Sequence, residues 1–304
     1  MRLYVAGSGG MLGEGFHRTA RADDVIRFTD KDVNAPWLSM LDFRDFDAYR
    51  DEVRTFQPDV LIHLGAHTSL EYCEQNPEDA YITNTLAVEN AITIANEMNV
   101  PLVYISTAGI FNGEKDLYDD WDQPDPLGVY ARSKYMGELA VQQRVARHYI
   151  CRAGWMMGGG VAKDKKFVSK IGKQLMAGAR ELNIVDDKDG TPTLTWDFAR
   201  NLRALLDTPY YGLYNMVCGG LTSRLEVATE MVRLLGLDNT IRINAVPSSH
   251  FAAEFFAPRP PNERLINRKL DLRGVNMMRD WRVALRDYIE ADWIDAIKAA
   301  HQAA

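Results

Sequence analysis

The sequence predicts an α/β fold: a doubly wound parallel sheet with a smaller lobe supplied by the second half of the chain. Short apolar segments alternate with amphipathic helical patterns through the first 155 residues, which is typical of parallel strands joined by right-handed crossovers. A glycine-rich turn follows the first apolar segment directly. Beyond about residue 155 the alternation gives way to loop-like glycine and lysine runs. We therefore expect domains at 1–155 and 156–304, with some later segments returning to the sheet.

Length and composition describe an ordinary globular protein. The 304 residues are enough for one large domain or two modest ones, and 46% are hydrophobic and 25% charged. The net charge of −7 and the lack of a basic run argue against a general nucleic-acid binder and against a membrane-surface protein. A small anionic ligand stays compatible with these values, because local charge can differ from the total.

Cysteine usage and the start of the chain indicate a reducing compartment. Cys73, Cys151 and Cys218 are far apart and lack metal-ligand spacing, so we expect buried thiols and no metal site. The chain opens on a strand without a signal-peptide pattern, and no apolar run reaches membrane-spanning length. Cytoplasmic localisation is the resulting expectation.

The first element is a strand at 2–6, which runs into the turn Gly7-Ser8-Gly9-Gly10-Met11-Leu12-Gly13 and a helical pattern through Ala20. Glycines at this Gly-x-x-Gly-x-x-Gly spacing permit a tight turn, close approach of a pyrophosphate and close packing of helix on strand. The helix N-terminus adds unpaired N–H groups and the positive end of its dipole. The turn therefore predicts dinucleotide binding in a Rossmann-type fold, against the alternative of a plain glycine-rich turn.

The second strand, at 25–30, ends on Asp30, 20 residues beyond Gly10. Dinucleotide folds place a carboxylate there on the adenosine ribose hydroxyls. Because a carboxylate repels a 2′-phosphate, we expect NAD(H) to be preferred over NADP(H). Two alternatives stay open: Asp30 is a solvated turn residue, or the nearby Arg27 and Lys31 accommodate a phosphate and NADP(H) binds.

The remaining strands of the first half end where ligands bind in open α/β sheets. A loop at 41–45 leads to a helix at 46–56, and the strand at 60–64 is followed by Gly65–Thr68. A helical stretch at 80–99 precedes the strand at 102–105, which ends in Ser106-Thr107. A helix from Tyr130 to about Arg147 and a strand at 149–152 complete this half.

Two histidines flank the end of the third long strand. His63 lies inside an apolar run, so we interpret it as a structural histidine. His67 is better placed for chemistry but has no evident partner in the sequence.

The second half is less regular than the first. Short strands at 183–185 and 213–216 are expected to belong to the sheet. Loop-like residues at 158–160 and 163–166 precede a helix that ends near Ala179. The pattern then predicts, in order, a turn-rich segment at 186–193, a helix at 224–235, a proline-rich loop at 258–261 and an amphipathic helix from about Trp281.

Tyr130 and Lys134 are four residues apart, so they share one face of the predicted helix. A free phenol titrates near pH 10 and is a poor acid or base in neutral water. An ammonium ~4–5 Å away, at an effective dielectric of ~20, favours the phenolate by roughly 3–4 kcal/mol. The pair is therefore a candidate for general acid–base catalysis with a lowered phenol pKa, although a lone Tyr-x-x-x-Lys is common in helices.

With these residues in place, the chain resembles an extended short-chain dehydrogenase/reductase, and within that group the dTDP-4-dehydrorhamnose reductase family. The resemblance covers nearly the whole length, and it depends on several motifs in the right order. These motifs are Gly7–Gly13, Ser106-Thr107 before Phe111-Asn112-Gly113, Pro124–Leu127 before Tyr130–Lys134, Arg152–Trp155, Asp187 with Gly190 and Pro192-Thr193, and Ala257–Pro260.

The resemblance implies a hydride transfer from NAD(P)H to the 4-keto group of a nucleotide-linked 6-deoxy sugar. Tyr130 would donate the proton, Lys134 would hold the nicotinamide ribose and tune Tyr130, and Thr107 would hydrogen-bond the keto oxygen. The cofactor positions that it implies are Gly7, Gly10, Met11, Leu12, Gly13, Asp30, Asp42, Phe43, Leu64, Gly65, Ala66, Asn84, Ser106, Tyr130 and Lys134. The candidates for the substrate side are Thr68, Thr107, Trp155, Lys166 and Arg259.

Departures from the family pattern fall where the sugar would be recognised. Ala108-Gly109 stand where Asp-Tyr is usual, Lys166 replaces an Asn, and Asp187-Lys188 replace Asp-Gln. A 4,6-dehydratase is disfavoured because Ala108 and Gly109 cannot ionise, and a C3/C5 epimerase because no cysteine or histidine is clearly placed as its extra base.

Other functions and the assembly state stay open at this stage. A 4-epimerase, which needs only the Tyr, Lys and Thr, is the main alternative, and a regulatory subunit that binds NADP without catalysis is a second. The nucleotide, the sugar and the stereochemistry are not determined. Extended members often dimerise through the helix that carries Tyr130, so a homodimer is an open expectation.

Overall fold

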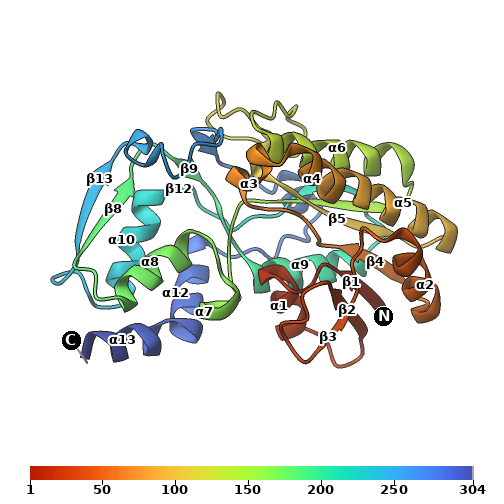
Figure 1. The fold of residues 1–304 in the computed structure, drawn as a ribbon, viewed down its shortest axis with the longest axis horizontal. Coiled ribbons are helices and arrows are strands. Elements are labelled where there is room, and N and C mark those ends of the chain that lie inside the picture. The colour runs from red at the N-terminus through yellow and green to blue at the C-terminus, as the bar shows by residue number, and fades with distance from the viewer. Residues whose placement is uncertain (303–304) are drawn as a thin grey trace.

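The computed structural model describes residues 1–302 and contains a seven-stranded sheet in which all paired strands are parallel. Its order is β11 (Gly212–Asn215), β6 (His148–Ala153), β5 (Leu102–Thr107), β4 (Val60–His63), β1 (Arg2–Ala6), β2 (Val25–Asp30) and β3 (Leu38–Met40). The order reverses between β1 and β4, which defines a doubly wound sheet (Figure 1). The predicted fold class is confirmed. In such sheets ligands bind outside the carboxyl ends of the strands at the reversal.

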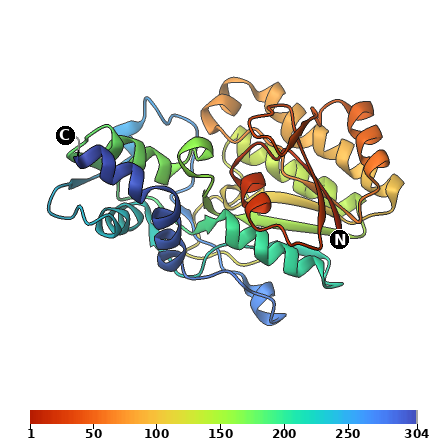
Figure 2. The same cartoon turned by 90° about the horizontal axis from the view of Figure 1, so that it is seen from below.

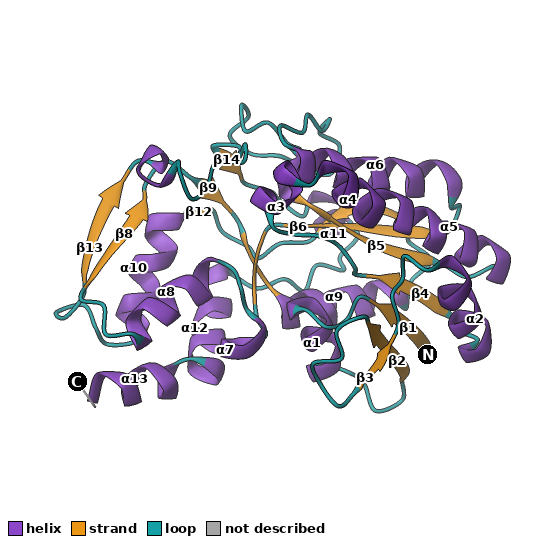
Figure 3. Ribbon diagram, viewed as in Figure 1, coloured by secondary structure: helices purple, strands orange, loops and turns teal. Residues whose placement is uncertain are grey.

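Helices cover both faces of this sheet, because alternate residues of each strand point to opposite sides. Leu3 and Val5 belong to the core beneath α1 (Met11–Arg18) and α9 (Thr195–Leu206). Tyr4 and Leu61 belong to the core beneath α2 (Phe46–Phe56), α5 (Ala87–Met98) and α6 (Val129–Arg144). Figure 3 shows these two helical layers with the strands between them.

The predicted helix at 80–99 is divided by a π-helical turn. After α3 (Leu70–Gln75), the chain forms α4 (Pro77–Tyr81), the π-helix η1 (Ile82–Leu86) and then α5. Such turns accommodate one extra residue within a helix and often occur at functional sites. Here the turn carries Asn84, whose contacts are described below.

The second half forms a separate lobe that contains three small sheets. In one, β7 (Trp155–Met157) pairs with β10 (Pro192–Leu194), and in another β9 (Asp189–Gly190) lies between β12 (Thr222–Ser223) and β14 (Asn262–Glu263). In the third, β8 (Glu181–Val185) pairs with β13 (Arg242–Val246). The predicted place of residues 183–185 in the main sheet is therefore wrong. The other predicted late strand does return there, as β11.

The helices of the lobe pack around the small sheets. They are α7 (Gly160–Lys163), α8 (Phe167–Met176), α10 (Arg224–Leu234), α12 (Trp281–Asp292) and α13 (Ile294–Gln302). The helix α11 (Arg268–Leu272) instead packs against β11 of the main sheet, and short 3-10 turns occur at η2 (Ala108–Ile110) in the first half and η3 (Ser248–Phe251) in the lobe. The predicted loop at 163–166 thus begins in α7. Figures 1 and 2 place the two chain ends at opposite ends of the molecule.

One hydrophobic core joins the lobe to the sheet. The cluster that contains Val5 continues through Trp196 of α9 to Trp281, Tyr288 and Trp293 at the C-terminal helices, all of which are buried. The lobe is therefore held against one face of the sheet by packed aromatic side chains. Among residues 1–302, no helix is long and apolar enough to cross a membrane.

Candidate active site

The glycine-rich turn sits at the point where the strand order reverses. Gly7 has a φ of +76°, and a Cβ on it would lie 2.4 Å from the Cα of Gly65 in the loop after β4. A Cβ on Gly13 would lie 2.0 Å from the carbonyl oxygen of Ser8. Glycine is therefore required at both positions, by contact between the two loops and between turn and helix.

A Gly7→Ala variant tests this contact. We expect it to lower the free energy of unfolding by roughly 2–4 kcal/mol, because positive φ strain and collision with backbone act together. Gly178→Ala is the matched control, since Gly178 has a φ of +82° but open space around its Cβ. That variant should lose only about 1–2 kcal/mol from strain. Equal losses in urea denaturation would contradict a role for the loop contact.

The start of α1 fits the phosphates of a dinucleotide. Gly10 caps this helix without any side-chain hydrogen bond, and nothing lies within 4 Å of where its Cβ would be. The first amides of α1 therefore face open space with no side chain between them and a ligand. The buried hydroxyl of Ser106, at the carboxyl end of β5, has no hydrogen-bond partner in the described part of the chain. Open helix amides and an unpaired polar atom are what a nicotinamide dinucleotide would satisfy.

Asp30 lies beside the same turn. Its carboxylate accepts hydrogen bonds from the backbone N–H groups of Gly9 (2.8 Å) and Asp32 (2.9 Å). Strand alternation places Arg27 on the opposite face, where its guanidinium contacts Ser39 and Glu52. Arg27 is therefore not placed to accommodate a phosphate near Asp30, which leaves Lys31 as the cation of the alternative raised from the sequence.

Other predicted cofactor positions lie in the loop after β4 and in the segment that packs against it. Leu64, Gly65 and Ala66 follow β4, and the Phe43 ring packs against Gly65, where a Cβ would be 2.1 Å from ring carbon Cε1. Asp42 is held by the guanidinium of Arg44 at 2.7 Å, whose hydrogen bonds lower the pKa of the carboxyl group.

Asn84 connects two parts of the candidate site through hydrogen bonds of its side chain. It is fully buried, and its side-chain amide accepts from the His67 N–H (2.8 Å) and donates to the Ser133 hydroxyl (3.0 Å). Asn84 therefore ties the loop after β4 to α6, which carries Tyr130 and Lys134.

Thr107 and Tyr130 meet at the carboxyl end of β5, where a hydrogen bond links their side chains, and Lys134 lies one turn further along α6. Thr107 is the last residue of β5, and the other two come from the first turns of α6. Burial raises the pKa of Tyr130 to about 12, and hydrogen bonding with Thr107 opposes this rise. Burial lowers the pKa of Lys134 to about 7, against the effect of the nearby Glu138 carboxylate. The predicted lowering of the Tyr130 pKa by Lys134 is wrong here, because burial disfavours both charged forms.

The surroundings of Lys134 are rigid. Its ammonium lies 4.2 Å from the centre of the Tyr104 ring, and the Tyr104 hydroxyl donates to the Lys134 carbonyl oxygen at 2.8 Å. One turn further along α6, Glu138 forms a buried ion pair with Arg152 of β6 at 2.6 Å. Glu74 accepts a hydrogen bond from the Val129 N–H (2.6 Å), which satisfies a free amide at the start of the helix.

The predicted substrate residues come together from both lobes. Lys166 donates hydrogen bonds to the carbonyl oxygen (3.0 Å) and hydroxyl (3.1 Å) of Thr68. Arg259 pairs with Glu71 of α3 at 2.6 Å. Burial, helped by nearby cations that include Arg224 and Arg259, lowers the pKa of Lys166 to about 8 against the effect of the Asp164 carboxylate. Three cations therefore gather on the lobe side of the candidate site, together with the carboxylates of Asp164, Glu71 and Glu263.

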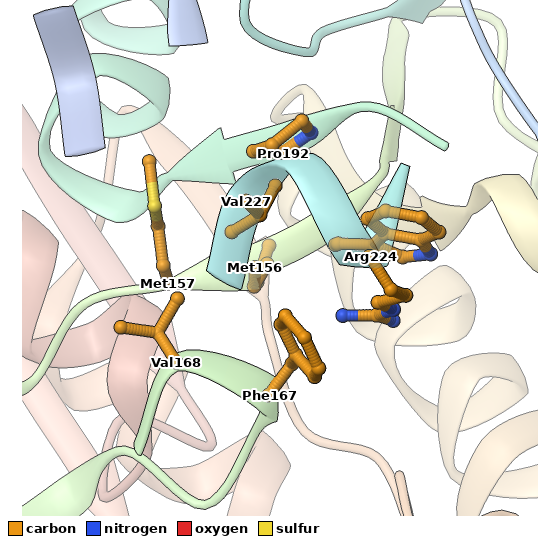
Figure 4. A pocket seen from close by; sticks show the side chains of 8 residues that line it. Met156, Met157, Phe167, Val168, Pro192, Arg224 and Val227 are labelled. Carbon is orange, nitrogen blue, oxygen red and sulfur yellow. The ribbon is translucent and has the colours of Figure 1, made fainter. Parts of the chain in front are cut away.

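Two candidate residues on the lobe side, Glu263 and Arg224, could not be identified from the sequence, and both contact Trp155. The Trp155 indole N–H donates to the carboxylate of Glu263 at 2.6 Å, and the Arg224 guanidinium lies 3.6 Å from the centre of the indole ring. Figure 4 shows Arg224 next to Phe167 at an adjacent pocket. That pocket is lined by Trp155, Met156, Met157, Phe167, Val168, Pro192, Arg224 and Val227. No local signal could identify Glu263, because its partner Trp155 is 108 residues away.

The remaining reactive side chains have structural surroundings. His63 is buried, which lowers its pKa to about 3, and it packs against Phe43. His67 does have a partner, since its Nε2 lies 2.7 Å from a carboxylate oxygen of Asp79. All three cysteines are free and buried, as expected, and burial raises the pKa of each thiol. No cluster of His, Cys, Asp and Glu within residues 1–302 could hold a metal ion.

The fold and the Thr–Tyr–Lys constellation together define an NAD(P)-dependent reductase of the extended short-chain dehydrogenase/reductase class. Residues 1–293 match the model of the RmlD substrate binding domain family. The chain is 32% identical over 296 residues to the dTDP-4-dehydrorhamnose reductase of Mycobacterium tuberculosis, covering 95% of this chain and 93% of that one. The chain belongs to the RmlD substrate binding domain family.

Solved structures agree with this assignment. A dTDP-4-dehydrorhamnose reductase from Bacillus anthracis in complex with NADP superimposes with a TM-score of 0.86 at 26% identity, over 96% of this chain and 99% of that one. A Thermus thermophilus UDP-glucose 4-epimerase in complex with NAD has the same fold, with a TM-score of 0.79 at 19% identity over 99% of this chain and all of that one.

Proposed function

We propose that this protein reduces the 4-keto group of a nucleotide-linked 4-keto-6-deoxy sugar with NAD(P)H. The observation that supports the proposal is the hydrogen bond between Thr107 and Tyr130 at the carboxyl end of β5, with Lys134 one turn further along the same helix. The cations Lys166, Arg224 and Arg259 lie on the lobe side. The names of the related reductases support the same substrate class.

Each of the three residues has a separate task. Tyr130 is protonated at neutral pH because its pKa is about 12, so it donates a proton to the keto oxygen as negative charge develops there. Thr107 hydrogen-bonds the same oxygen and holds the phenol in place. Lys134 holds the nicotinamide ribose. The nicotinamide cofactor, when bound, supplies the hydride.

The cationic side chains of Lys166, Arg224 and Arg259 suit a diphosphate. The charges of Arg224 and Arg259 lower the pKa of Lys166, and the charge of Arg259 lowers the pKa of Arg224, so these cations repel one another. The carboxylates of Asp164, Glu71 and Glu263 offset part of this repulsion. A diphosphate between them would relieve this repulsion, and guanidinium groups bind two phosphate oxygens at once. A sugar placed beyond the diphosphate reaches Trp155 and the Thr107–Tyr130 pair.

The charge of Lys166 predicts a pH dependence. Lys166 is cationic below its pKa of about 8 and neutral above it, so affinity for an anionic substrate should fall as the pH rises through 8. We expect the KM for the nucleotide sugar to increase above pH 8, approaching tenfold per pH unit, at saturating cofactor. Lys166→Arg should remove this dependence because arginine stays charged. A KM that rises equally in both proteins would contradict the assignment.

Asp30 makes NADH the preferred cofactor in this proposal. The carboxylate is fixed against Gly9 and would face a 2′-phosphate without relief from Arg27. The related Bacillus anthracis enzyme was solved with NADP, so the preference needs a direct measurement. Fluorescence titration should give a lower Kd for NADH than for NADPH, and Asp30→Asn should narrow the difference. Tighter binding of NADPH by the unmodified protein would overturn the preference.

The proposed reaction is tested by following oxidation of NADH and NADPH with dTDP-, UDP-, GDP- and CDP-linked 4-keto-6-deoxy sugars. We expect turnover with at least one of them and a deoxy sugar product reduced at C4. Interconversion of C4 epimers of a nucleotide sugar without net cofactor oxidation would instead identify a 4-epimerase. Cofactor binding without turnover of any sugar would indicate a regulatory subunit.

A further inference from the structure

Glu263 places a carboxylate directly beside the proposed reaction centre. A Cβ built on Gly109 would lie 3.2 Å from Oε1 of Glu263 and 3.5 Å from Oγ1 of Thr107. The two oxygens therefore flank one small space. The Glu263 charge also contributes to the raised pKa of Tyr130, which indicates that the carboxylate is close to the phenol as well.

The Glu263 carboxylate is held in position by its other oxygen, Oε2. Oε2 accepts the Trp155 indole N–H at 2.6 Å. Glu263 itself belongs to strand β14, which pairs with β9 at Gly190. The preceding residue, Asn262, donates hydrogen bonds to the carbonyl oxygens of Lys115 (2.7 Å) and Asp116 (2.8 Å), which anchor the strand to the first half of the chain.

The second carboxylate oxygen remains available. Within residues 1–302, Oε1 of Glu263 accepts no hydrogen bond, although it faces the space next to Thr107. An ionised carboxylate only accepts hydrogen bonds, so the ligand group that satisfies Oε1 must be a donor. Thr107 and Tyr130 act on the carbonyl oxygen in the proposed reaction. The donor therefore belongs to an atom adjacent to that carbonyl.

We propose that Glu263 selects the substrate by accepting a hydrogen bond from the C3 hydroxyl of the 4-keto sugar. This inference depends on the proposed reductase function. In a 4-keto-6-deoxy pyranose the carbonyl carbon has two neighbours, C3 and C5. C5 carries only a hydrogen, the ring oxygen and the methyl group, so C3 is the neighbour that offers a donor. Glu263 is thus a specificity-determining residue, and Gly109 leaves the space that the sugar edge needs.

The test compares two substrates and three variants. The substrates are the 4-keto-6-deoxy sugar that the unmodified protein reduces and its 3-deoxy analogue. The variants are Glu263→Ala, Glu263→Gln and the control Glu290→Gln, which changes an exposed carboxylate on α12. In Glu263→Gln the amide oxygen can still accept the Trp155 N–H, so the amide NH₂ group would face the C3 hydroxyl and donate to its oxygen, and a neutral hydrogen bond of reversed direction would replace the charge-assisted one.

We expect losses in kcat/KM that depend on whether the substrate carries the C3 hydroxyl. The unmodified protein and Glu290→Gln should lose roughly 10- to 100-fold in kcat/KM on going to the 3-deoxy analogue. On the hydroxyl-bearing substrate Glu263→Ala should lose a similar factor in kcat/KM and Glu263→Gln a smaller one, whereas both should change less than about threefold on the 3-deoxy analogue. Both Glu263 variants should keep the Kd for NADH of the unmodified protein. A general structural defect would instead raise this Kd.

Two results would overturn the assignment. Equal losses by the Glu263 variants on both substrates would show a structural role for the carboxylate. Equal kcat/KM of the unmodified protein for both substrates would show that the C3 hydroxyl is not recognised. Failure of the proposed function looks different, because the unmodified protein would then oxidise no cofactor with either sugar.

Discussion

Tyr130→Phe is expected to lower kcat for keto-sugar reduction by about 10²- to 10⁴-fold, which is the contribution usual for a positioned general acid. Phenylalanine fills the same volume but offers no proton to the keto oxygen. With a pKa of about 12, the phenol of the unmodified protein is protonated throughout the neutral range, so its removal takes away the proton donor at every working pH.

The matched control is Tyr135→Phe. Tyr135 lies on the same helix, and its hydroxyl accepts a hydrogen bond from Gln123 at 3.1 Å, away from Thr107. That variant should keep kcat within about twofold. Both proteins should bind NADH as the unmodified chain does, since the phenol is not the group that holds the dinucleotide phosphates. A Tyr130→Phe protein that retains more than a tenth of kcat would remove Tyr130 from the role of proton donor.

Local signals explain why the first half of the chain could be predicted closely. The helix predicted at 46–56 is observed with those bounds. Asp45 caps its first turn by accepting the Ala48 N–H, and Gln57 ends it in a left-handed conformation. Such signals lie within a few residues of the element that they define. The glycine-rich turn and the Tyr–Lys pair are of the same kind.

Features that depend on distant contacts could not be predicted. Residues 183–185 look like any buried strand, and their partner β13 lies about 60 residues later. The π-helical turn at Asn84 is linked to Ser133 on another helix. Burial raises the pKa of Tyr130, and the sequence spacing between Tyr130 and Lys134 gives no information on burial.

The lobe side of the candidate site illustrates the same limit. Its predicted residues Lys166 and Arg259 were found from motif order, and the structure brings both into contact with the segment that follows β4. Glu263 and Arg224 were missed because each acts through Trp155, which is remote from both in sequence. Chain topology, rather than residue type, places these charges around one indole.

The largest effect on stability is expected from Glu138. Its carboxylate and the Arg152 guanidinium are almost completely buried and contact one another at 2.6 Å between α6 and β6. Glu138→Ala leaves the Arg152 charge buried without its partner, so the free energy of unfolding should fall by about 3–5 kcal/mol in urea denaturation. Glu138 also raises the pKa of Lys134, so its loss should lower that pKa further below its usual range and weaken cofactor binding.

Two further proteins test whether the loss of stability comes from leaving a charge buried without a partner. Glu89→Ala removes the α5 partner of Arg144, which lies on α6 with Glu138, but this pair is exposed, so we expect the free energy of unfolding to fall by no more than about 1 kcal/mol. Glu138→Leu combined with Arg152→Met should recover most of the stability that Glu138→Ala loses, because no charge is then buried. Equal losses for Glu89→Ala and Glu138→Ala would show that the buried pair adds nothing beyond a surface contact. Recovery in the double variant without recovery of cofactor affinity would show that Glu138 supports Lys134 through its charge.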